Sequence, residues 1–338
     1  MNSILQNQEE PRSFQNDLNN LLSIYNEELK KEVDDLKQKK KDLEEEFQNT
    51  IGEIFHLNKT ILELEKKNMD LEKRNNHLKH KFHQKMCLHI TFFYREERFS
   101  FLNNIIDEVA EYRYVTDIYI HTNTFFDKTL LHDNLGGSVF VIVHHLENEK
   151  DPLTWKCRSL LKKQVDDYDY FMYIEDDILV KKEAIEYWFH YKDRLIENGF
   201  NLGFVRVEVD ENGEEFVSDI FEKIENFVCF VEGEQFIVNN KFPFCCFWIY
   251  DKKEFTKWTQ SSFYDPANIK GYGVTEQSAV GLHGLCTGWY RTTVLPLNNN
   301  FCLLPECKIY DMSQQCLKRR EDKNFPNGKI KFSECVQY

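Results

Sequence analysis

Residues 168–180, YDYFMYIEDDILV, join a run of aromatic and apolar residues to three consecutive acids. The first seven of these residues predict a strand, because they contain the short apolar run YFMYI. The triplet Glu175-Asp176-Asp177 follows directly, and a second apolar stretch begins at Ile178. The acids are therefore expected at the edge of a sheet, where the strand ends.

The segments on either side of this strand alternate between strand and helix patterns. Further strands are expected at residues 86–94, 116–122 and 138–143, and helices at residues 99–112, 154–165 and 182–195. Alternation at this spacing predicts a mainly parallel sheet with helices on both faces. The expected fold class is α/β, and residues 85–338 are long enough for one such domain.

Clustered carboxylates at the carboxyl end of a strand suggest a cation site. In open α/β sheets, ligands bind at the carboxyl ends of the strands, and adjacent acids there are costly unless a cation neutralises them. Oxygen ligands suit Mg²⁺ or Mn²⁺, and such an ion commonly offsets the charge of a diphosphate leaving group. The alternative is that the acids cap the next helix or are simply solvated.

Residues 170–188, YFMYIEDDILVKKEAIEYW, resemble the metal-binding strand of GT-A-fold glycosyltransferases, whose acidic DxD signature often takes the form EDD. Residues 153–158, 203–208 and 274–281 also resemble segments of that group. The resemblance covers residues 87 to 300 and implies a GT-A fold, a Mn²⁺ or Mg²⁺ cofactor and a nucleotide-sugar donor, most simply a UDP-sugar.

The resemblance also assigns roles to individual residues. Asp177 would bind the metal, while Glu175 and Asp176 would contact the ribose, the base or metal-bound water. Tyr94 and Arg95, at the end of the first strand, would lie against the nucleotide. On the helix before the acids, Arg158 and Lys162 lie one turn apart and could reach the diphosphate, or could belong to a solvated helix face.

A general base and a third metal ligand are expected in the C-terminal part of the chain. An inverting transferase needs a base for the acceptor hydroxyl, and Glu276, in GYGVTEQSAVG, is the first choice, although an acid there could equally stabilise a helix N-terminus. Glu208 and Asp210 are the second choices. His283 is the expected third metal ligand, with packing in the core as its alternative, and Glu306 could take its place.

Four tryptophans have two possible roles. They could line an acceptor groove, since sugars stack on aromatic faces, but their apolar neighbours favour packing in the core. These residues are Trp188, Trp248, Trp258 and Trp289.

Residues 17–84 follow a heptad repeat. The d positions hold leucine at eight of nine places, namely Leu22, Leu29, Leu36, Leu43, Leu57, Leu64, Leu71 and Leu78, with Thr50 as the exception. The a positions, three residues earlier, hold apolar residues or Asn, with Lys40 among them. Leucine at d with β-branched residues or Asn at a favours a parallel two-stranded coiled coil, so a homodimer is expected.

Charged residues beside the a and d positions favour parallel pairing of two helices. The g and e positions attract each other between helices at three places, Glu32–Lys37, Lys39–Glu44 and Lys67–Glu72, and repel each other at Arg74–Lys79. Gly52 is the only helix breaker between residues 17 and 82, so a single helix or an intramolecular hairpin is the weaker interpretation. A continuous helix of this length is about 100 Å long and would act as a stalk.

Composition narrows the class of protein. The chain has 338 residues, 41% of them hydrophobic, and a formal net charge of -14, which argues against a nucleic-acid-binding protein. Its apolar runs are too short for a membrane-spanning helix and its first residues do not resemble a secretory signal, so a cytoplasmic location is expected. The ten cysteines mostly lie in apolar runs and are expected to be free thiols.

These observations lead to one expected organisation and two possible functions. The chain is divided into a flexible N-terminus (1–16), a dimerisation stalk (17–84) and a GT-A-like domain (85–338). The expected function is metal-dependent transfer of a sugar to a hydroxyl on a protein, glycan or lipid. The alternative is a coiled-coil scaffold protein whose transferase-like domain is a degenerate nucleotide-binding module.

Overall fold

The computed structural model describes residues 10–81, 84–147, 152–225, 227–239, 241, 243–265, 268 and 291–337. The chain divides into two compact units between His77 and Leu78. Among the described residues, no helix is both long enough and apolar enough to cross a membrane. The nine cysteines in the described part of the chain are all free thiols, as expected from their apolar surroundings.

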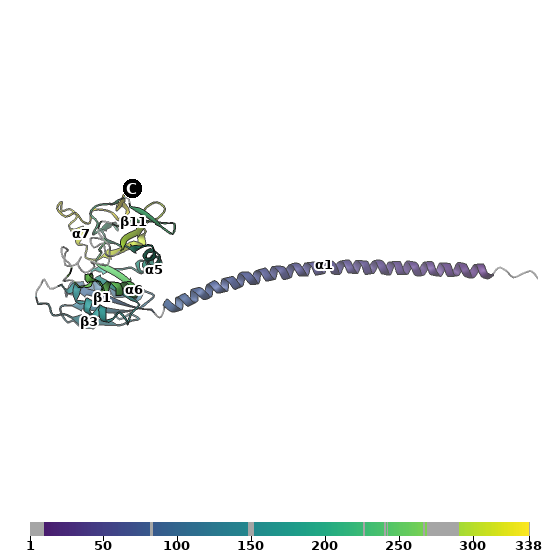
Figure 1. Ribbon diagram of the computed structural model, residues 1–338, viewed down its shortest axis with the longest axis horizontal. Helices are drawn as coiled ribbons and strands as arrows, with labels where there is room; N and C mark the ends of the chain where they lie inside the picture. The colour runs from purple at the N-terminus through teal and green to yellow at the C-terminus, as the bar shows by residue number, and fades with distance from the viewer. Residues whose placement is uncertain are drawn as a thin grey trace, which may run out of the picture. The chain divides into compact units, whose positions relative to one another are not determined.

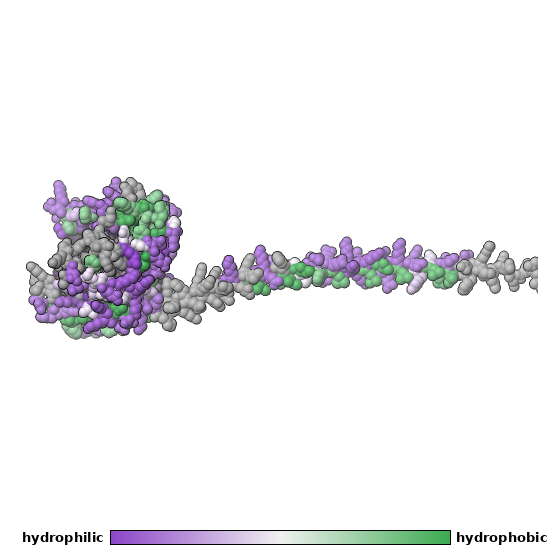
Figure 2. All heavy atoms as spheres, viewed as in Figure 1, coloured by the Kyte–Doolittle hydropathy of each residue, from purple (hydrophilic) through white to green (hydrophobic). Residues whose placement is uncertain are grey.

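The described part of the first unit is one long helix, which continues past the boundary to Lys81. Helix α1 (Glu10–Lys81) has 72 residues and is therefore about 110 Å long (Figure 1). It begins before residue 17, the expected start of the stalk, and continues without interruption through Gly52. Its apolar side chains are exposed and gather along one side of the helix (Figure 2).

The second unit is built on a five-stranded sheet, here called sheet A, in the order β12-β4-β1-β2-β3. Strands β1 (Lys85–Phe92), β2 (Val115–Thr122), β3 (Val139–Val143) and β4 (Tyr170–Glu175) are parallel, while β12 (Phe247–Asp251) is antiparallel to β4. Seven of the eight residues of β1 and five of the six of β4 are buried, which agrees with their largely apolar sequences. The expected mixed α/β fold with a mainly parallel sheet is confirmed.

Helices pack on this sheet through apolar stripes. Helix α2 (Phe99–Ala110) buries Leu102, Ile105, Ile106 and Val109, which lie on one face at helical spacing. Helices α5 (Lys182–Glu197) and α6 (Lys252–Thr259) follow β5 and β12. The helix expected at residues 154–165 is instead two short helices, α3 (Leu153–Lys156) and α4 (Arg158–Lys163), with Cys157 between them, where the Cys157 amide bonds to the Trp155 carbonyl instead of the carbonyl four residues back.

Shorter strands form the other side of the unit, around β11 and α7 in Figure 1. Their sheets have the orders β10-β11-β13-β6, β5-β14-β7-β8 and β15-β9. The strands are β5 (Ile178–Leu179), β6 (Phe200–Leu202), β7 (Val205–Val209), β8 (Glu215–Val217), β9 (Ile224–Glu225), β10 (Val228–Val231), β11 (Glu234–Val238), β13 (Thr292–Pro296), β14 (Lys308–Asp311) and β15 (Val336–Gln337). The short helices are η1 (Glu96–Arg98), η2 (Lys128–Leu130), η3 (Ser262–Tyr264), η6 (Pro305–Cys307), α7 (Gln315–Lys318) and η7 (Phe332–Glu334).

Candidate functional site

The order of strands in sheet A fixes where a ligand site can form. The chain runs from β1 outward through β2 to β3, and then returns to place β4 on the other side of β1. Strand order therefore reverses between β1 and β4, and in open α/β sheets a crevice forms outside the carboxyl ends of the strands at such a point. The triplet Glu175-Asp176-Asp177 lies at the carboxyl end of β4, beside the end of β1.

Main-chain hydrogen bonds hold each residue of the triplet against a different part of the unit. The Glu175 amide donates to the Cys246 carbonyl at 3.2 Å, just before β12. The Asp176 amide donates to the Thr91 carbonyl of β1 at 3.1 Å, and the Asp177 carbonyl accepts from the Met312 amide at 2.8 Å, just after β14. The three carboxyl groups are thus fixed at the junction of sheet A and the smaller sheet that contains β14.

Arg98, the last residue of η1, neutralises part of this acidic cluster. Its guanidinium donates to Asp176 Oδ1 at 2.6 Å and to Asp177 Oδ2 at 3.3 Å. Burial alone would lower the pKa of Arg98, but the two aspartates raise it, so the group stays charged. Because the side chain is only 19% exposed, this pairing is only weakly screened by solvent.

A cavity of about 530 Å³ opens beside the triplet. Its polar lining includes Glu175, Asp177 and Arg98, together with a second group of charges around Arg206. Arg206 bonds to both carboxylate oxygens of Asp219, and its Nη1 lies 3.4 Å from Asp311 Oδ2. A cavity of this size falls in the range that takes a small organic ligand.

The carboxylates of this cavity outnumber its cations. Asp177, Asp219 and Asp311 line the cavity, and together with Asp176, which pairs with Arg98, they lie near two guanidinium groups. Burial first, and the charge of Asp177 second, raise the pKa of Glu175 to about 8 and that of Asp176 to about 6. Burial and Asp311 raise the pKa of Asp177 as well. The local field therefore favours binding of a positive charge.

Two buried oxygens of the triplet lack a hydrogen-bond partner. Glu175 Oε1 and Asp176 Oδ2 are out of reach of solvent and accept no hydrogen bond in the structure. A buried acceptor without a partner costs free energy, and a divalent cation or a ligand hydroxyl would remove that cost. Both atoms are carboxylate oxygens, the ligand type that Mg²⁺ and Mn²⁺ prefer.

The donor chemistry therefore fits a hard divalent cation, with Asp177 and Asp311 at the cavity wall. Within the described residues, however, no group of three or more His, Cys, Asp or Glu side chains is arranged to hold a metal ion. Arg98 and Arg206 pair with these carboxylates in the structure.

Tyr94 and Arg95, which the resemblance places against the nucleotide, follow β1 directly after Phe93. The Tyr94 amide donates to Asn123 Oδ1 at 2.8 Å, and its partly buried ring contacts Phe99 and Phe126. Arg95 is exposed, and its carbonyl accepts the Arg98 amide at the start of η1. Neither residue lines the cavity beside Asp177.

Arg158, which could reach the diphosphate according to the resemblance, has its own partners in the structure. It is buried, its guanidinium donates to the carbonyls of Phe263 and Tyr264, and it stacks over the Trp258 ring at 5.0 Å. Desolvation lowers its pKa. Arg158 is therefore part of the packing between α4, α6 and η3, and it is not among the residues that line the cavity beside Asp177.

The structure describes only some of the residues expected to act as the general base or as the third metal ligand. Glu276 and His283 lie outside the described residues. Glu208 is fully buried and accepts the amides of Cys316 and Leu317, which fixes the start of α7. Asp210 accepts the amides of Asn212 and Glu214 in a turn. These two carboxylates are therefore occupied by the backbone.

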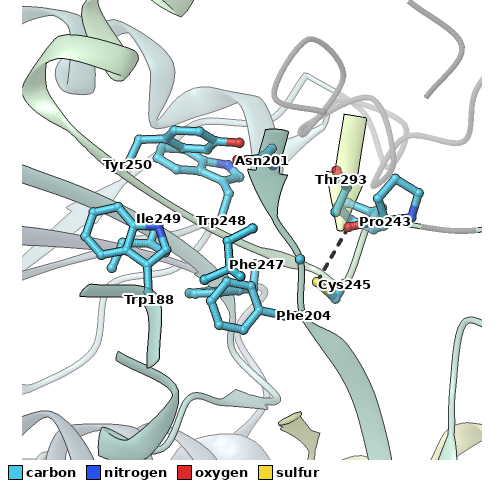
Figure 3. Close-up of a pocket in the computed structure, with 13 residues that line it drawn as sticks. Trp188, Asn201, Phe204, Pro243, Cys245, Phe247, Trp248, Ile249, Tyr250 and Thr293 are labelled. Atoms are coloured by element: carbon cyan, nitrogen blue, oxygen red, sulfur yellow. Dashed lines mark hydrogen bonds between the residues drawn. The ribbon is translucent and has the colours of Figure 1, made fainter. Parts of the chain in front are cut away.

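Three of these four tryptophans lie in the described residues and contribute to the core rather than to an open groove. Trp188, Trp248 and Trp258 are buried, as the packing interpretation predicts, and Trp289 lies outside the described residues. A cavity of only about 40 Å³ is lined by Trp188 from α5 and Trp248 from β12, next to the rings of Phe204, Phe247 and Tyr250 (Figure 3). A space of this size holds a water molecule and not a sugar.

Three charged residues of the site are not identifiable from the sequence pattern alone. Arg98 lies in the charged stretch REER, residues 95–98, shortly after the end of β1. This position is the only feature of the sequence that could have indicated Arg98 as a residue of the site. Arg206 and Asp311 lie in short strands distant in sequence. They reach the cavity because β14 pairs with both β5 and β7.

No known family model matches the chain, and a search of curated proteins returned no match.

Proposed function

We propose that the second unit is a metal-dependent glycosyltransferase of the GT-A type, which takes its sugar from a nucleotide-sugar donor and transfers it to a hydroxyl acceptor. The observation that carries this proposal is the position of the triplet. Three acids end the strand β4 at the point where strand order reverses, beside a cavity of about 530 Å³ with an excess of carboxylates. A UDP-sugar is the donor class that the resemblance favours.

Carboxylates at the cavity would bind the metal ion, and arginines would bind the phosphates. Asp177 would hold the divalent ion, with Asp311 as the nearest additional carboxylate. When bound, the ion would supply positive charge that stabilises the diphosphate as a leaving group. Arg98 and Arg206, both at the cavity wall, would bind the phosphate oxygens, since guanidinium groups match phosphate geometry.

Glu175 is suited to act as an uncharged hydrogen-bond donor. With a pKa of about 8, it is mostly protonated at neutral pH and can donate a hydrogen bond to a ribose or sugar oxygen. The acceptor base of an inverting reaction remains assigned to Glu276 and the third metal ligand to His283, both from the resemblance. Helix α1 would act as a coiled-coil stalk. This function needs no catalytic residue.

Turnover of donors tests the proposal. The purified chain is incubated with a panel of nucleotide-sugars with Mn²⁺, with Mg²⁺ and with EDTA, and release of the nucleoside diphosphate is measured. We expect one donor to be hydrolysed only with metal, and Asp177→Asn to lower this rate by at least 100-fold. Asp166→Asn, which changes a carboxylate that is 92% exposed, is the control and should keep the rate.

A scaffold function is the second candidate, and one observation favours it. Arg98 and Arg206 already neutralise part of the acidic cluster, and no complete metal-binding group is arranged among the described residues. Under this proposal the second unit binds a nucleotide without transferring its sugar. Metal-dependent protection against thermal unfolding by a nucleotide-sugar, without release of the nucleoside diphosphate, would support it.

A further inference from the structure

Helix α1 carries an apolar stripe that nothing in the described part of the chain covers. The stripe consists of ten large side chains at the a and d positions: Leu22, Leu29, Val33, Leu36, Leu43, Phe47, Ile54, Leu57, Ile61 and Leu64. Each of them is 41–65% exposed. Exposed apolar surface on this scale marks an interaction site, and a helix gains most of its stability by packing such a face.

We infer that the stripe pairs with the same stripe of a second copy of this chain, in a parallel, in-register, two-stranded coiled coil. The inference does not depend on the proposed transferase activity. A 3.5-residue repeat sustained over about six heptads is typical of a coiled coil, and a helix with the same repeat and the same length, such as an identical copy, would cover the whole stripe.

Polar residues inside the stripe select the parallel orientation. In a parallel in-register pair, Asn26 faces Asn26 of the second copy, and the two amides can bond to each other. In an antiparallel pair, a positions face d positions, so Asn26 and Lys40 would face leucines in almost every register. A buried amide without a partner is costly, which disfavours that orientation.

Lys40 is compatible with the parallel pair because its charge can leave the interface. Its Nζ lies 3.7 Å from Glu44 Oε1 on the same helix, at the edge of the stripe. The aliphatic part of the side chain can then cover the seam while the ammonium group stays in water. A lysine at a single a position lowers stability while helping to fix the oligomeric state.

Charges at the edges of the stripe are complementary between parallel copies. Glu32 would face Lys37 of the second copy, and Lys39 would face Glu44. In the single helix, Lys37 pairs with Asp34 at 3.2 Å, but the two side chains are 72% and 63% exposed. Such an exposed pair contributes little, so it can be exchanged for an interhelical pair at small cost.

Sedimentation of the full chain tests the pairing. Wild type is expected to sediment as a dimer of 40.7 kDa chains. Leu36→Asp combined with Leu43→Asp places charges at two d positions, and this variant should sediment as a monomer at the same concentration. The control combines Lys41→Asp with Gln48→Asp, two exposed b positions that face away from the stripe, and should remain a dimer. Thermal unfolding of the α/β unit should be the same in all three proteins.

Cross-linking then tests the orientation. Asn26→Cys, made together with Cys302→Ser to remove an exposed native thiol, should form a disulfide between copies when oxidised glutathione accepts the two electrons. Glu28→Cys at the outward c position is the matched control and should cross-link far more slowly. A monomeric wild type, a trimer, a dimer that survives the two d-position aspartates, or a dimer that the Asn26→Cys variant fails to cross-link would each overturn the inference.

Discussion

Arg98 holds together two aspartates that would otherwise repel each other, and this gives the first prediction. In Arg98→Met, Asp176 and Asp177 lose their counter-charge while remaining buried, so stability without metal should fall by about 3 kcal/mol. A divalent cation should then compensate, and the rise in melting temperature on adding Mn²⁺ should be larger in the variant than in wild type. Calorimetry with Mn²⁺ and with EDTA measures both effects.

The control for this prediction is Arg113→Met. Arg113 pairs with Glu186 at 3.1 Å, but both side chains are about half exposed, so its loss should change stability little. If Mn²⁺ raises the melting temperature of Arg98→Met by no more than that of wild type, Arg98 does not share its carboxylates with a cation.

A row of three histidines crosses sheet A and gives the second prediction. His89 Nδ1 lies 2.8 Å from His121 Nε2, and His121 Nδ1 lies 2.8 Å from His144 Nε2; Gln164 Oε1 accepts from His89 at 3.0 Å. Burial lowers the pKa of His89 to about 3 and that of His121 to about 2. Burial also lowers the pKa of His144.

Because burial lowers the pKa values of these histidines, they make the folded state less stable as pH falls. Below about pH 6.5 the unfolded chain takes up protons at these histidines and the folded chain does not, so their contribution to stability is lost as pH falls. Glu175 and Asp176 act in the opposite sense, because their raised pKa values let the folded state bind protons first. The histidine effect must therefore be measured as a difference between variants.

Between about pH 6.5 and 5.5, each buried histidine should cost about 1 kcal/mol of stability. His121→Gln should therefore lose about 1 kcal/mol less than wild type over this interval, as measured by urea unfolding. His145→Gln removes an exposed imidazole next in sequence to His144 and serves as control, with a loss equal to that of wild type. Equal losses in His121→Gln and wild type would show that the row takes up protons in the folded state.

At the scale of elements, strands buried on both faces were predictable because burial makes their sequences continuously apolar. Strands β1 and β4 and the acids at the end of β4 follow from this pattern. Strand β12 lies in an apolar run, but its antiparallel direction depends on the path of the chain between elements. The break at Cys157 between α3 and α4 is likewise a matter of local hydrogen bonding that helical periodicity does not reveal.

Helix α1 gives a prediction at the same scale. Gly52 lies within the helix, and no atom lies within 4 Å of the place that the methyl group of an alanine would take, so Gly52→Ala adds no clash. The substitution should stabilise the helix by about 0.5–1 kcal/mol, because alanine loses less backbone entropy on folding. Thermal melting followed by far-ultraviolet circular dichroism measures the change.

A second glycine provides the matched control. Gly213 is equally open, but its φ is +80° in the turn that Asp210 closes. Gly213→Ala should therefore destabilise the α/β unit, because a side chain is strained in this backbone conformation. Stabilisation at Gly213, or destabilisation at Gly52, would contradict the assigned backbone conformations.

At the scale of the whole molecule, the division into a long helix and an α/β unit follows from the change in periodicity after the heptad repeat, and the structure has its boundary between His77 and Leu78. The candidate site could be predicted only in part. The triplet is contiguous in sequence, whereas Arg98, Arg206 and Asp311 meet it through strand pairing and ion pairs. The burial of Arg158 could not be predicted, because a basic side chain is buried against aromatic rings only when backbone carbonyls accept its hydrogen bonds.

The most direct test of the central claim is calorimetric titration of UDP and GDP into the full chain, with Mn²⁺ and with EDTA. The account predicts that one of these nucleotides binds with Mn²⁺, that binding is lost with EDTA and in Asp177→Asn, and that Asp166→Asn binds as wild type does. Binding that is unchanged by EDTA and by Asp177→Asn, or no binding of either nucleotide to wild type, would contradict it.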